Sequence, residues 1–415
     1  MSAPWYESRF TGLFTRFGEI PLRPHDPQVP ICAGTLPAVG ARREELAVGG
    51  AAWEPLAAVE GCVGEAIERW QPYALPHDQF VESSADEWPL DEPAVEPGRW
   101  VLFHPQQYAQ AGFPFQPFTS RTHCRWVCFR EAGSGKPYWV PEELAFLYLP
   151  PPRIHRLGTC VSTGLACSRF PDQALLRGLQ EVIERDAVMG AWWDRYPLEE
   201  WPRRHVLRLL GPEASRRIVR PNLSYRFFRI DSPYAAHVTL VALEGEDEEG
   251  YCFSIGAACR ETRRAGWEKA TLEAVQGRHY IRFLKPRAQA AAAASADTVE
   301  RLTSFADHAV YYSLYPERLS TTVLARPGPP DAGPEDLVEG LRDLIERLGA
   351  EHLVLFRNLT PGSLAQQFPD WIVTRVLVPG LQPLHGNHHL PHLGGKLWAP
   401  RTLAEWATSP PHPFP

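Results

Sequence analysis

An acidic helical turn occurs three times in this chain, at positions far apart in the sequence, and any fold has to place all three copies. The turn reads Glu-Ala-Ile-Glu-Arg over Glu65–Arg69, Glu-Val-Ile-Glu-Arg over Glu181–Arg185 and Glu-Ala-Val-Gln-Gly-Arg over Glu273–Arg278. Side chains three residues apart lie on the same face of a helix. Each copy therefore presents a pair of oxygen-bearing side chains with an arginine beside it.

The side chains of the three turns suit one kind of chemistry if the fold brings them together. Hard cations such as Mg²⁺ take oxygen ligands, and the planar guanidinium group matches the geometry of phosphate. A cavity lined by these carboxylates and arginines would hold Mg²⁺ and phosphate. The carboxylates are Glu65, Glu68, Glu181, Glu184 and Glu273, and the arginines are Arg69, Arg185 and Arg278.

The alternative is that these turns are ordinary ion pairs on solvated helix faces, each worth about 0.2–0.5 kcal/mol. A fourth, similar sequence, Leu344–Arg347, lies in a strongly polar context and is predicted to be such a surface copy. The other copies have glycine on or near the acidic stripe, at Gly61, Gly178 and Gly266. Glycine inside a helix costs about 1 kcal/mol relative to alanine, which suggests that something approaches the backbone there. The recurrence favours a functional site.

Composition excludes several classes of protein. The 415 residues allow two or three average domains or one large one. A formal net charge of −7 gives no reason to expect nucleic acid or an anionic membrane as partner. No apolar stretch reaches the ~18–20 residues of a membrane-spanning helix, and residues 1–10 lack the apolar run of a signal peptide. The sequence therefore predicts a cytoplasmic protein without a membrane segment.

Cysteine and histidine usage gives no strong metal signature. Eight cysteines in mostly apolar contexts fit a reducing compartment, and Cys124 and Cys128 are interpreted as core residues. Four histidines lie in a stretch punctuated by Pro and Gly, where helical ligand spacing does not apply. Loop packing or contact with substrate is the first interpretation of these histidines, and zinc is the alternative. They are His385, His388, His389 and His392.

Helices and strands are predicted to alternate along the chain, which is typical of α/β layers. Because similar helices occur in each third, we expect one internally pseudo-repeated fold more than separate domains. Gly133-Ser134-Gly135 is predicted to be a plain turn, because Arg130 and Pro137 depart from the phosphate-loop pattern. The expected long helices are 55–70, 171–193 and 262–284, with an alanine-rich connection or helix end over 287–296. The expected strands are 121–129, 136–140, 237–243, 251–255, 352–356 and 371–378.

The chain closes on Pro-His-Pro-Phe-Pro over Pro411–Pro415. Proline locks φ, so this segment favours an extended polyproline II rod with little entropy left to lose. A disordered tail is one interpretation, because proline-rich termini are commonly disordered. The other is a stiff rod that delivers a carboxylate into a cavity at modest ordering cost.

Taken together, these motifs resemble those of the YcaO family over nearly the whole chain, from about Thr11 onward. Ser162–Ala166, followed by Gly178–Ala187, resembles the central signature of the family. The turns at Glu65 and Glu273 resemble its first and third signatures. Val378–Gly386 and the terminal Pro-x-Pro-x-Pro resemble its azoline-forming branch.

This resemblance implies a YcaO-like α/β fold with mixed sheets and long helices around a central nucleotide site. It implies a catalytic domain over 11–400 and a proline-rich tail over 401–415. The implied activity is that of an ATP-dependent cyclodehydratase that converts Cys, Ser or Thr of a ribosomal precursor peptide to thiazoline or (methyl)oxazoline through phosphorylation of the backbone amide oxygen. Mg²⁺ would be held by Glu65, Glu68, Glu181, Glu184 and Glu273, ATP by Arg69, Glu181, Gln276 and Arg278, and the catalytic residues would be Arg185 and Pro415.

The chain departs from the family pattern at several positions. Gly61 stands where many members have Ser, Gln173 where many have Glu, and Ser168-Arg169 where many have Gly-Asn. Gly50-Ala51-Ala52 replaces a Gly-Lys-Gly element. Two other activities therefore stay open, namely a peptide thioamide synthetase and a catalytically degenerate scaffold subunit.

The resemblance also implies partners. They are a ribosomal precursor peptide, a ThiF-like partner protein that binds the leader peptide, and a flavin dehydrogenase in the same complex. No domain for leader capture is apparent before the first motif, which is why a separate partner is expected. A homodimer is the oligomeric state that the resemblance favours.

Overall fold

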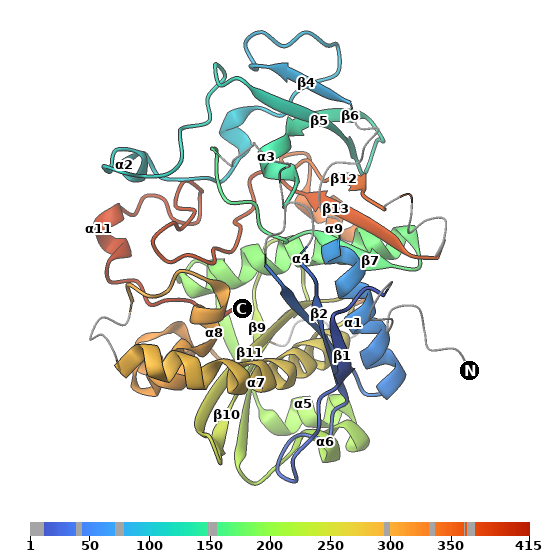
Figure 1. Ribbon diagram of the computed structural model, residues 1–415, viewed down its shortest axis with the longest axis vertical. Coiled ribbons are helices and arrows are strands. Elements are labelled where there is room, and N and C mark those ends of the chain that lie inside the picture. Colours follow the sequence, from blue (N-terminus) through green and yellow to red (C-terminus); the bar gives the residue numbers. More distant parts are fainter. Residues whose placement is uncertain are drawn as a thin grey trace.

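The computed structural model describes residues 12–38, 44–70, 79–147, 149, 156–293, 299–331, 337–360, 362 and 370–415. Within them the chain forms three sheets whose paired strands run antiparallel. The first has the order β1-β2-β3, the second β11-β10-β9-β8, and the third β4-β5-β12-β13-β7 with β6 paired to β5. Figure 1 shows the third sheet in the upper half of the molecule and the second in the lower half, with α4 between them.

The strands of the first sheet are β1 (Arg16–Glu19), β2 (Ile31–Leu36) and β3 (Leu46–Ala51). The second sheet consists of β8 (Leu198–Trp201), β9 (Leu223–Ile230), β10 (Val238–Asp247) and β11 (Gly250–Cys259). The third consists of β4 (Phe80–Ser83), β5 (Cys124–Glu131), β6 (Pro137–Pro141), β7 (Leu165–Ser168), β12 (Leu355–Asn358) and β13 (Ile372–Leu377).

The long helices are α1 (Pro55–Trp70), α4 (Pro171–Trp192) and α7 (Arg263–Ala293). The shorter ones are α2 (Pro105–Tyr108), α3 (Glu142–Ala145), α5 (Arg203–Leu210), α6 (Pro212–Ile218), α8 (Phe305–Leu314), α9 (Leu341–Leu348) and α11 (Leu403–Trp406). Short 3₁₀ helices are η2 (Pro97–Arg99), η3 (Pro316–Thr321) and η4 (Val323–Ala325). No described helix combines the length and the apolar character that a membrane crossing requires.

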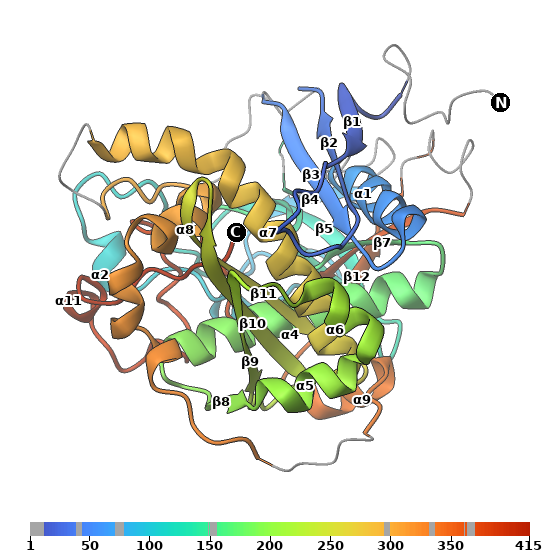
Figure 2. The ribbon, with the colours of Figure 1, turned by 90° about the horizontal axis from the view of Figure 1, so that it is seen from below.

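Each long helix packs against two of the sheets. Helix α1 contacts β2 and β3 of the first sheet and β7 of the third, α4 contacts β7 and β13 of the third and β9 and β11 of the second, and α7 contacts β10 and β11 of the second and β3 of the first. The three helices therefore link the three sheets in a closed circuit (Figures 1 and 2). This arrangement confirms the predicted α/β, internally repeated fold and places the three acidic turns around one centre.

The apolar cores follow the same division. Ala66 and Ile67 of α1 belong to one cluster of buried side chains, Leu179 and Ile183 of α4 to a second, and Trp267 of α7 to a third. Burying each such side chain contributes about 1.5–3 kcal/mol, so packing rather than helix propensity fixes how each helix is rotated. The acidic turns face the centre because the opposite faces of the helices are buried against the sheets.

Most of the expected elements are confirmed, with two kinds of difference. Helix α7 continues through Pro286 to Ala293, beyond the expected end at Leu284. Proline removes only one helical hydrogen bond, and the alanines that follow have the highest helix propensity. The strands β1–β4 and β7–β9 were not expected, and most of them are short strands, which carry a weak periodic signal.

Candidate active site

The acidic turns of α1 and α4 are built alike. In α1, Arg69 lies with its Nη1 3.3 Å from Glu68 Oε1 and its Nη2 4.0 Å from Glu65 Oε1. In α4, Arg185 lies 3.8 Å from an Oε1 of both Glu181 and Glu184. The two turns, which are similar in sequence, therefore also place their arginine beside both glutamates in the same way.

Backbone N–H groups from three different sheets fix one carboxylate oxygen of three of these glutamates. Gly49 of β3 donates to Glu65 Oε2 at 2.8 Å, and Gly164, just before β7, donates to Glu181 Oε2 at 3.0 Å. Cys259, the last residue of β11, donates to Glu184 Oε2 at 3.2 Å. The other oxygen of each carboxylate, Oε1, lies within 4.0 Å of the arginine of its own turn.

Gly164 is required at its position. Its φ of +87° lies in the left-handed region, and a Cβ there would lie 2.1 Å from the carbonyl oxygen of Val376. Only glycine combines this backbone conformation with so close an approach. The tight contact between the residue before β7 and β13 aims the N–H of Gly164 at Glu181.

Burial and neighbouring carboxylates both disfavour the charged forms of Glu68 and Glu184. Burial raises the pKa of Glu68 to about 8 against the pull of Arg69, and the charges of Glu181 and Glu65 add to the rise. Burial likewise raises the pKa of Glu184 to about 7 against the pull of Arg185, and Glu273 and Glu181 add to it. Carboxylates of all three long helices are therefore electrostatic neighbours. We call Glu65, Glu68, Glu181, Glu184 and Glu273 the glutamate cluster.

Helix α7 brings Glu273 and Gln276 to this cluster. Lys269, one turn earlier, lies with its Nζ 3.0 Å from Glu273 Oε1. Burial alone would raise the pKa of Glu273, but Lys269, Arg185 and Arg260 together lower it. Gln276 lies against Gly49, where an added Cβ would meet its Nε2 at 2.9 Å. Gln276 is thus next to the N–H group that holds Glu65.

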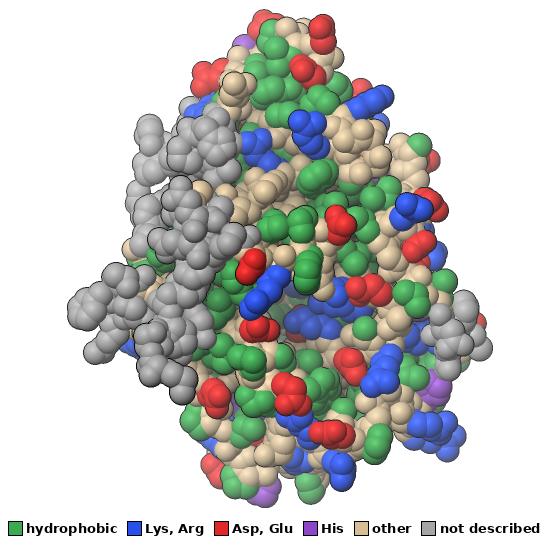
Figure 3. Space-filling view, turned by 90° about the vertical axis from the view of Figure 1, so that its right-hand side faces the viewer, with side chains coloured by type: hydrophobic (Ala, Val, Ile, Leu, Met, Phe, Trp, Pro, Cys, Tyr) green, Lys and Arg blue, Asp and Glu red, His purple; other side chains and the backbone are tan. Residues whose placement is uncertain are grey.

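Arg185 is the cation that connects the three helices. Burial lowers its pKa, but Glu184, Glu181 and Glu273 outweigh that effect and the pKa is raised, while Arg69 acts in the opposite direction. On the face of the molecule that is on the right in Figure 1, Figure 3 shows a hollow with Lys and Arg side chains at its bottom and acidic side chains around it. The glutamate cluster is partly open, since Glu65, Glu181 and Glu273 are 34%, 24% and 33% exposed.

Sequence reasoning missed three cations that face the cluster, namely Arg260, Lys269 and Arg375. Arg375 of β13 is buried and lowers the pKa of Glu68 electrostatically, and its Nε and Nη1 have no hydrogen-bond partner among the described residues. The signal was a single charge inside the apolar run of β13. Arg260 follows β11 directly and Lys269 precedes Glu273 by one turn, so both positions were visible once the strand and helix ends were known.

The structure does not bring Arg278 to the glutamate cluster. Arg278 is 1% exposed, and its Nη2 donates to Asp247 at 2.5 Å at the end of β10. The same carboxylate accepts from Arg282, which also binds Asp26. A residue two positions after Gln276 points to the opposite side of a helix. The prediction that Arg278 binds the cofactor therefore has no geometric support, because its guanidinium is committed to the β10–β11 hairpin.

Replacing Arg278 with Met should destabilise the fold by about 3 kcal/mol, because it leaves part of a buried carboxylate network uncompensated. Urea unfolding measures this loss. Binding of a non-hydrolysable ATP analogue, corrected for the folded fraction, should stay within about 2-fold of the wild type. If Met does not yield folded protein, Arg278→Lys, which keeps the charge, serves the same comparison. A large loss of nucleotide affinity with unchanged stability would restore the original assignment.

The glycines beside the acidic turns allow strands of the protein to pack closely against the helices. A Cβ at Gly178 would lie 2.6 Å from the side chain of Val376, and one at Gly266 would lie 2.8 Å from Thr239 Oγ1. Gly61 faces Gly50 of β3, where a Cβ would meet Ala58 O of α1 at 2.3 Å. The inference that something approaches the helix backbone holds, and neighbouring strands are what approaches.

The fourth, similar sequence at Leu344–Arg347 and the glycine-rich turn at Gly133–Gly135 are as predicted. Glu346 and Arg347 of α9 are exposed, so this fourth copy is a surface turn. In the turn after β5, Glu131 accepts from the N–H groups of Gly133 and Ser134, so these donors are not free for phosphate. Neither feature contributes to the glutamate cluster.

Two of the departures from the family pattern, Ser168-Arg169 and Gln173, make contacts away from the glutamate cluster. Arg169 pairs with Glu60 at 2.8 Å, and Gln173 Oε1 accepts from Ser168 Oγ at 2.8 Å. Arg169 also stacks on the ring of Trp371. These side chains bind one another on the surface, and none of their contacts involves the glutamate cluster.

The C-terminal segment Pro411–Pro415 packs into the protein. Residues 411–414 are buried, and Pro415 is exposed. Tyr312 donates to the carbonyl of Pro411 at 2.6 Å, Phe414 packs edge-on against Trp192 of α4, and Arg185 lowers the pKa of His412 electrostatically, after burial and His308. Arg185 and Trp192 are seven residues apart and lie on one face of α4. Figures 1 and 2 show this end of the chain inside the outline of the molecule.

A partly buried carboxylate cluster surrounded by arginines is a site for a divalent cation and phosphate. Residues 49–382, well over half of the chain, match the family described as YcaO cyclodehydratase, ATP- and Mg²⁺-binding. The chain belongs to the YcaO family, and its cofactors are ATP and Mg²⁺. No curated relative matches it in sequence.

Solved structures share the fold. A heterocyclase in complex with substrate and cofactor superposes with a TM-score of 0.68 at 15% identity and covers 98% of this chain, which spans only 54% of that protein. YcaO from Methanopyrus kandleri, bound with AMPPCP and Mg²⁺, gives 0.56 at 17% identity, covering 89% of this chain and 86% of that one. The E. coli microcin synthetase McbBCD complex with pro-MccB17 bound gives 0.62 at 14% identity, covering 96% of both chains.

The residues present fit these cofactors. Burial first, and then the charges of neighbouring carboxylates, raise the pKa values of Glu68 and Glu184, and a divalent cation would neutralise such a crowded set. The buried Arg375 has donors without partners, as a phosphate-binding guanidinium requires. The donor set is all oxygen, which suits Mg²⁺.

Proposed function

We propose that this chain is an ATP-dependent cyclodehydratase that converts Cys, Ser or Thr residues of a ribosomal precursor peptide to thiazoline or (methyl)oxazoline. The supporting observation is that the acidic turns of three distant helices meet at Arg185 while the C-terminal segment lies along the same face of α4. A peptide thioamide synthetase would use the same ATP chemistry but has no need of a docked terminal segment. A scaffold subunit would need neither feature.

ATP, when bound with Mg²⁺, supplies the phosphoryl group that makes the amide oxygen of the peptide a leaving group. The glutamate cluster would hold the metal, and the backbone N–H groups of Gly49, Gly164 and Cys259 each fix one of its carboxylates. Phosphoryl transfer depends mostly on positioning and charge neutralisation, so rigid ligands on three packed helices are the relevant contribution.

The cations around the cluster bind and orient the polyphosphate. Arg69 and Arg185 lie against the glutamates of their own helices, and Arg375 faces Glu68 from β13. Lys269 and Arg260 add positive charge from the third helix and from the strand before it. They supply the charge that a lysine at position 51 would carry, so its absence does not leave phosphate unpaired.

The C-terminal segment takes part in proton transfer. Its buried residues lie beside Arg185, which supports our proposal that the carboxylate of Pro415 acts on the reacting amide. That carboxylate accepts the proton of the attacking thiol or hydroxyl, and Arg185 stabilises its charge. A positioned base of this kind contributes about 10²–10⁴-fold to the rate.

The peptide would enter through a pocket beside the cluster. Its walls are mainly apolar and include Trp100, Leu102 and Leu381, while Thr163 and Arg375 supply polar groups. Because Arg375 also faces Glu68, the pocket ends next to the metal ligands. Such a wall accepts the apolar surface of a substrate and leaves orientation to a few polar groups.

The proposal includes partners and a compartment. The structural neighbours include a complex of several proteins with a bound precursor peptide, which supports a leader-binding, ThiF-like partner for this chain. A flavin dehydrogenase in that complex and a homodimer of this chain belong to the same proposal. The use of ATP and the free cysteines support the proposed cytoplasmic compartment.

Incubation with ATP, Mg²⁺, the partner protein and a candidate precursor peptide tests the activity. Loss of one water per modified residue, with one phosphate released for each, is the expected result by mass spectrometry and phosphate assay. A gain equal to exchange of oxygen for sulfur would indicate a thioamide synthetase instead. An unchanged peptide mass without phosphate release would support the scaffold.

A further inference from the structure

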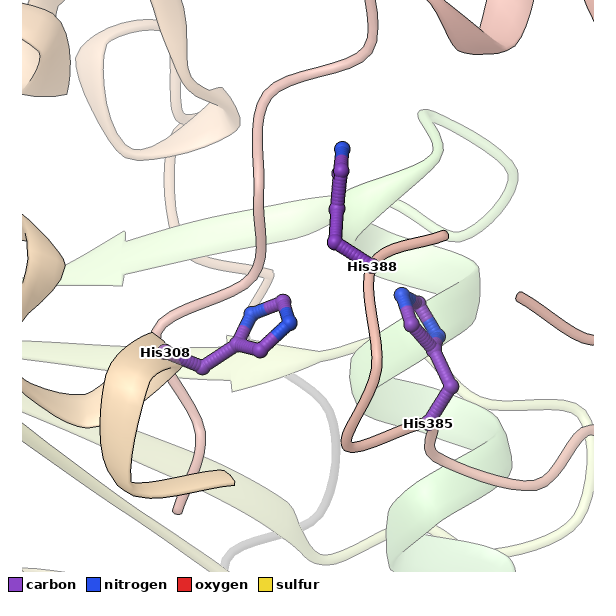
Figure 4. A group of neighbouring side chains, drawn as sticks. All are labelled: His308, His385 and His388. Carbon is purple, nitrogen blue, oxygen red and sulfur yellow. The ribbon is translucent and has the colours of Figure 1, made fainter. Parts of the chain in front are cut away.

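Three histidines from two distant segments meet in the interior, behind the C-terminal segment. His308 projects from α8, and His385 and His388 project from the loop that follows β13 (Figure 4). One ring nitrogen of each lies within 4.8 Å of the others, and all three side chains are buried. We call these three residues the histidine cluster.

Four ring nitrogens of the histidine cluster have no hydrogen-bond partner in the described part of the chain. His308 Nε2, both ring nitrogens of His385 and His388 Nδ1 are buried without a hydrogen-bond partner among the described residues. A buried polar atom left unpaired costs about 1–3 kcal/mol, so several in one place call for a ligand that satisfies them together. An aromatic stack alone would leave that cost uncompensated.

His308 is oriented as a metal ligand is. Its Nδ1 donates to the backbone carbonyl of His412 at 2.8 Å, which leaves the lone pair on Nε2, and Nε2 is buried without a hydrogen-bond partner within the ranges that the structure describes. Metal-binding histidines typically donate their other ring N–H to a carbonyl or carboxylate in this way. His412 uses both of its own nitrogens, donating to His385 O and accepting from Phe414 N–H, so it supports the cluster without joining it.

The surroundings keep the rings neutral and dry. The indole of Trp406 lies 4.6 Å from the ring of His388 and 5.4 Å from that of His385, centroid to centroid. The three side chains are shielded from solvent, with His308, His385 and His388 at most 5% exposed. Neutral imidazole is the form that binds metal, and zinc is the first-row ion most often held by such nitrogen ligands.

We propose that His308, His385 and His388 bind one Zn²⁺, at a site separate from the glutamate cluster. A tetrahedral zinc with bonds of about 2.0–2.1 Å needs nitrogens about 3.4 Å apart, so nitrogens up to 4.8 Å apart must close by up to about 1.4 Å. The described residues offer no fourth protein ligand, so a water completes the coordination. The proposal does not depend on the cyclodehydratase activity.

Zinc at this place links α8 to the loop after β13 and thereby stiffens the support of the C-terminal segment. His308, once ligated, holds the carbonyl of His412, and His385 presents its own carbonyl to His412. The metal would therefore act on the position of Pro411–Pro415 through packed residues. Its expected role is structural.

Cobalt substitution in the full-length chain, without an affinity tag, tests the site. Excess Mg²⁺ is kept throughout so that Co²⁺ does not report on the glutamates. After removal of bound metals with a chelator, one equivalent of Co²⁺ should produce intense visible absorption typical of four-coordinate cobalt with nitrogen ligands, and one equivalent of Zn²⁺ should abolish it. Elemental analysis should then find one zinc per chain.

Matched variants locate the ligands. His388→Ala should lose the cobalt absorption and the thermal stabilisation by Zn²⁺, whereas His389→Ala should keep both, because His389 is in the same loop but bonds the carbonyl of Glu300 instead. If His388→Ala does not fold, the wild-type titration decides alone. Absence of the visible band in the wild type, or its persistence in His388→Ala, would overturn the proposal.

Discussion

Replacing Glu184 with Gln is expected to lower ATP-dependent turnover by ~100-fold or more while the protein stays folded. Glu184 is the most buried member of the glutamate cluster, at 6% exposure, and burial, with the charges of Glu273 and Glu181, raises its pKa. Gln keeps the shape and can still accept the N–H of Cys259, but it brings no charge to the metal. Phosphate release and thermal stabilisation by Mg²⁺ with an ATP analogue measure the loss.

The matched control is Glu346→Gln. Glu346 stands in the same Ile-Glu-Arg context on α9 but is exposed, so turnover and stability should be unchanged. If Glu184→Gln is fully active, or fails only because it unfolds, Glu184 is not a metal ligand.

The same pKa values predict a pH effect in metal-free buffer. The folded-state pKa values of Glu68, about 8, and Glu184, about 7, lie above the ordinary value of 4.5. Their protonated forms favour folding, so this stability is present below pH 4.5 and is lost as the pH rises through 7 to 8. The melting temperature of the wild type should therefore fall toward pH 8, and that of Glu184→Gln should fall less. Equal slopes for the two proteins would contradict the assignment.

Deleting Phe414 and Pro415 is expected to slow cyclisation of the peptide by about 10²–10⁴-fold and to leave ATP affinity within a few fold. The segment lies along α4 beside Arg185, and its contacts are with Trp192, Tyr312 and His308 rather than with the glutamates, so the nucleotide site should survive. Peptide mass spectrometry gives the rate, and thermal shift with an ATP analogue gives the affinity.

Because Phe414 is buried against Trp192, its loss also removes packing. Adding one glycine after Pro415 separates the two effects, since every native side chain stays in place and only the carboxylate moves. This extension should be nearly as slow as the deletion. A fully active extension would show that the segment acts by packing, and a fully active deletion would show that it has no part in the reaction.

Much of this arrangement was predictable from local sequence. The three long helices, the β5–β6 and β10–β11 hairpins and the surface position of Glu346 follow from periodicity, turn residues and polar context. The convergence of Glu65, Glu181 and Glu273 was a hypothesis from recurrence, because helical spacing gives a face and says nothing of distance between helices.

The features of the site that were not predicted from the sequence depend on long-range contacts. Arg278 matched the family motif, yet its helix is rotated by packing so that the guanidinium meets Asp247. Arg375 and the N–H groups of Gly49 and Gly164 become part of the site only when strands far apart in the chain are placed. His308 was not associated with His385 for the same reason, since 77 residues separate them.

The most direct test of the central claim is a crystal structure of this chain with Mn²⁺ in place of Mg²⁺ and a non-hydrolysable ATP analogue. Anomalous scattering locates manganese without reference to the surrounding side chains. The account predicts manganese between carboxylates of α1, α4 and α7, with the triphosphate against Arg69 and Arg185. Manganese and nucleotide bound elsewhere, with Glu68, Glu184 and Glu273 holding no metal, would contradict it.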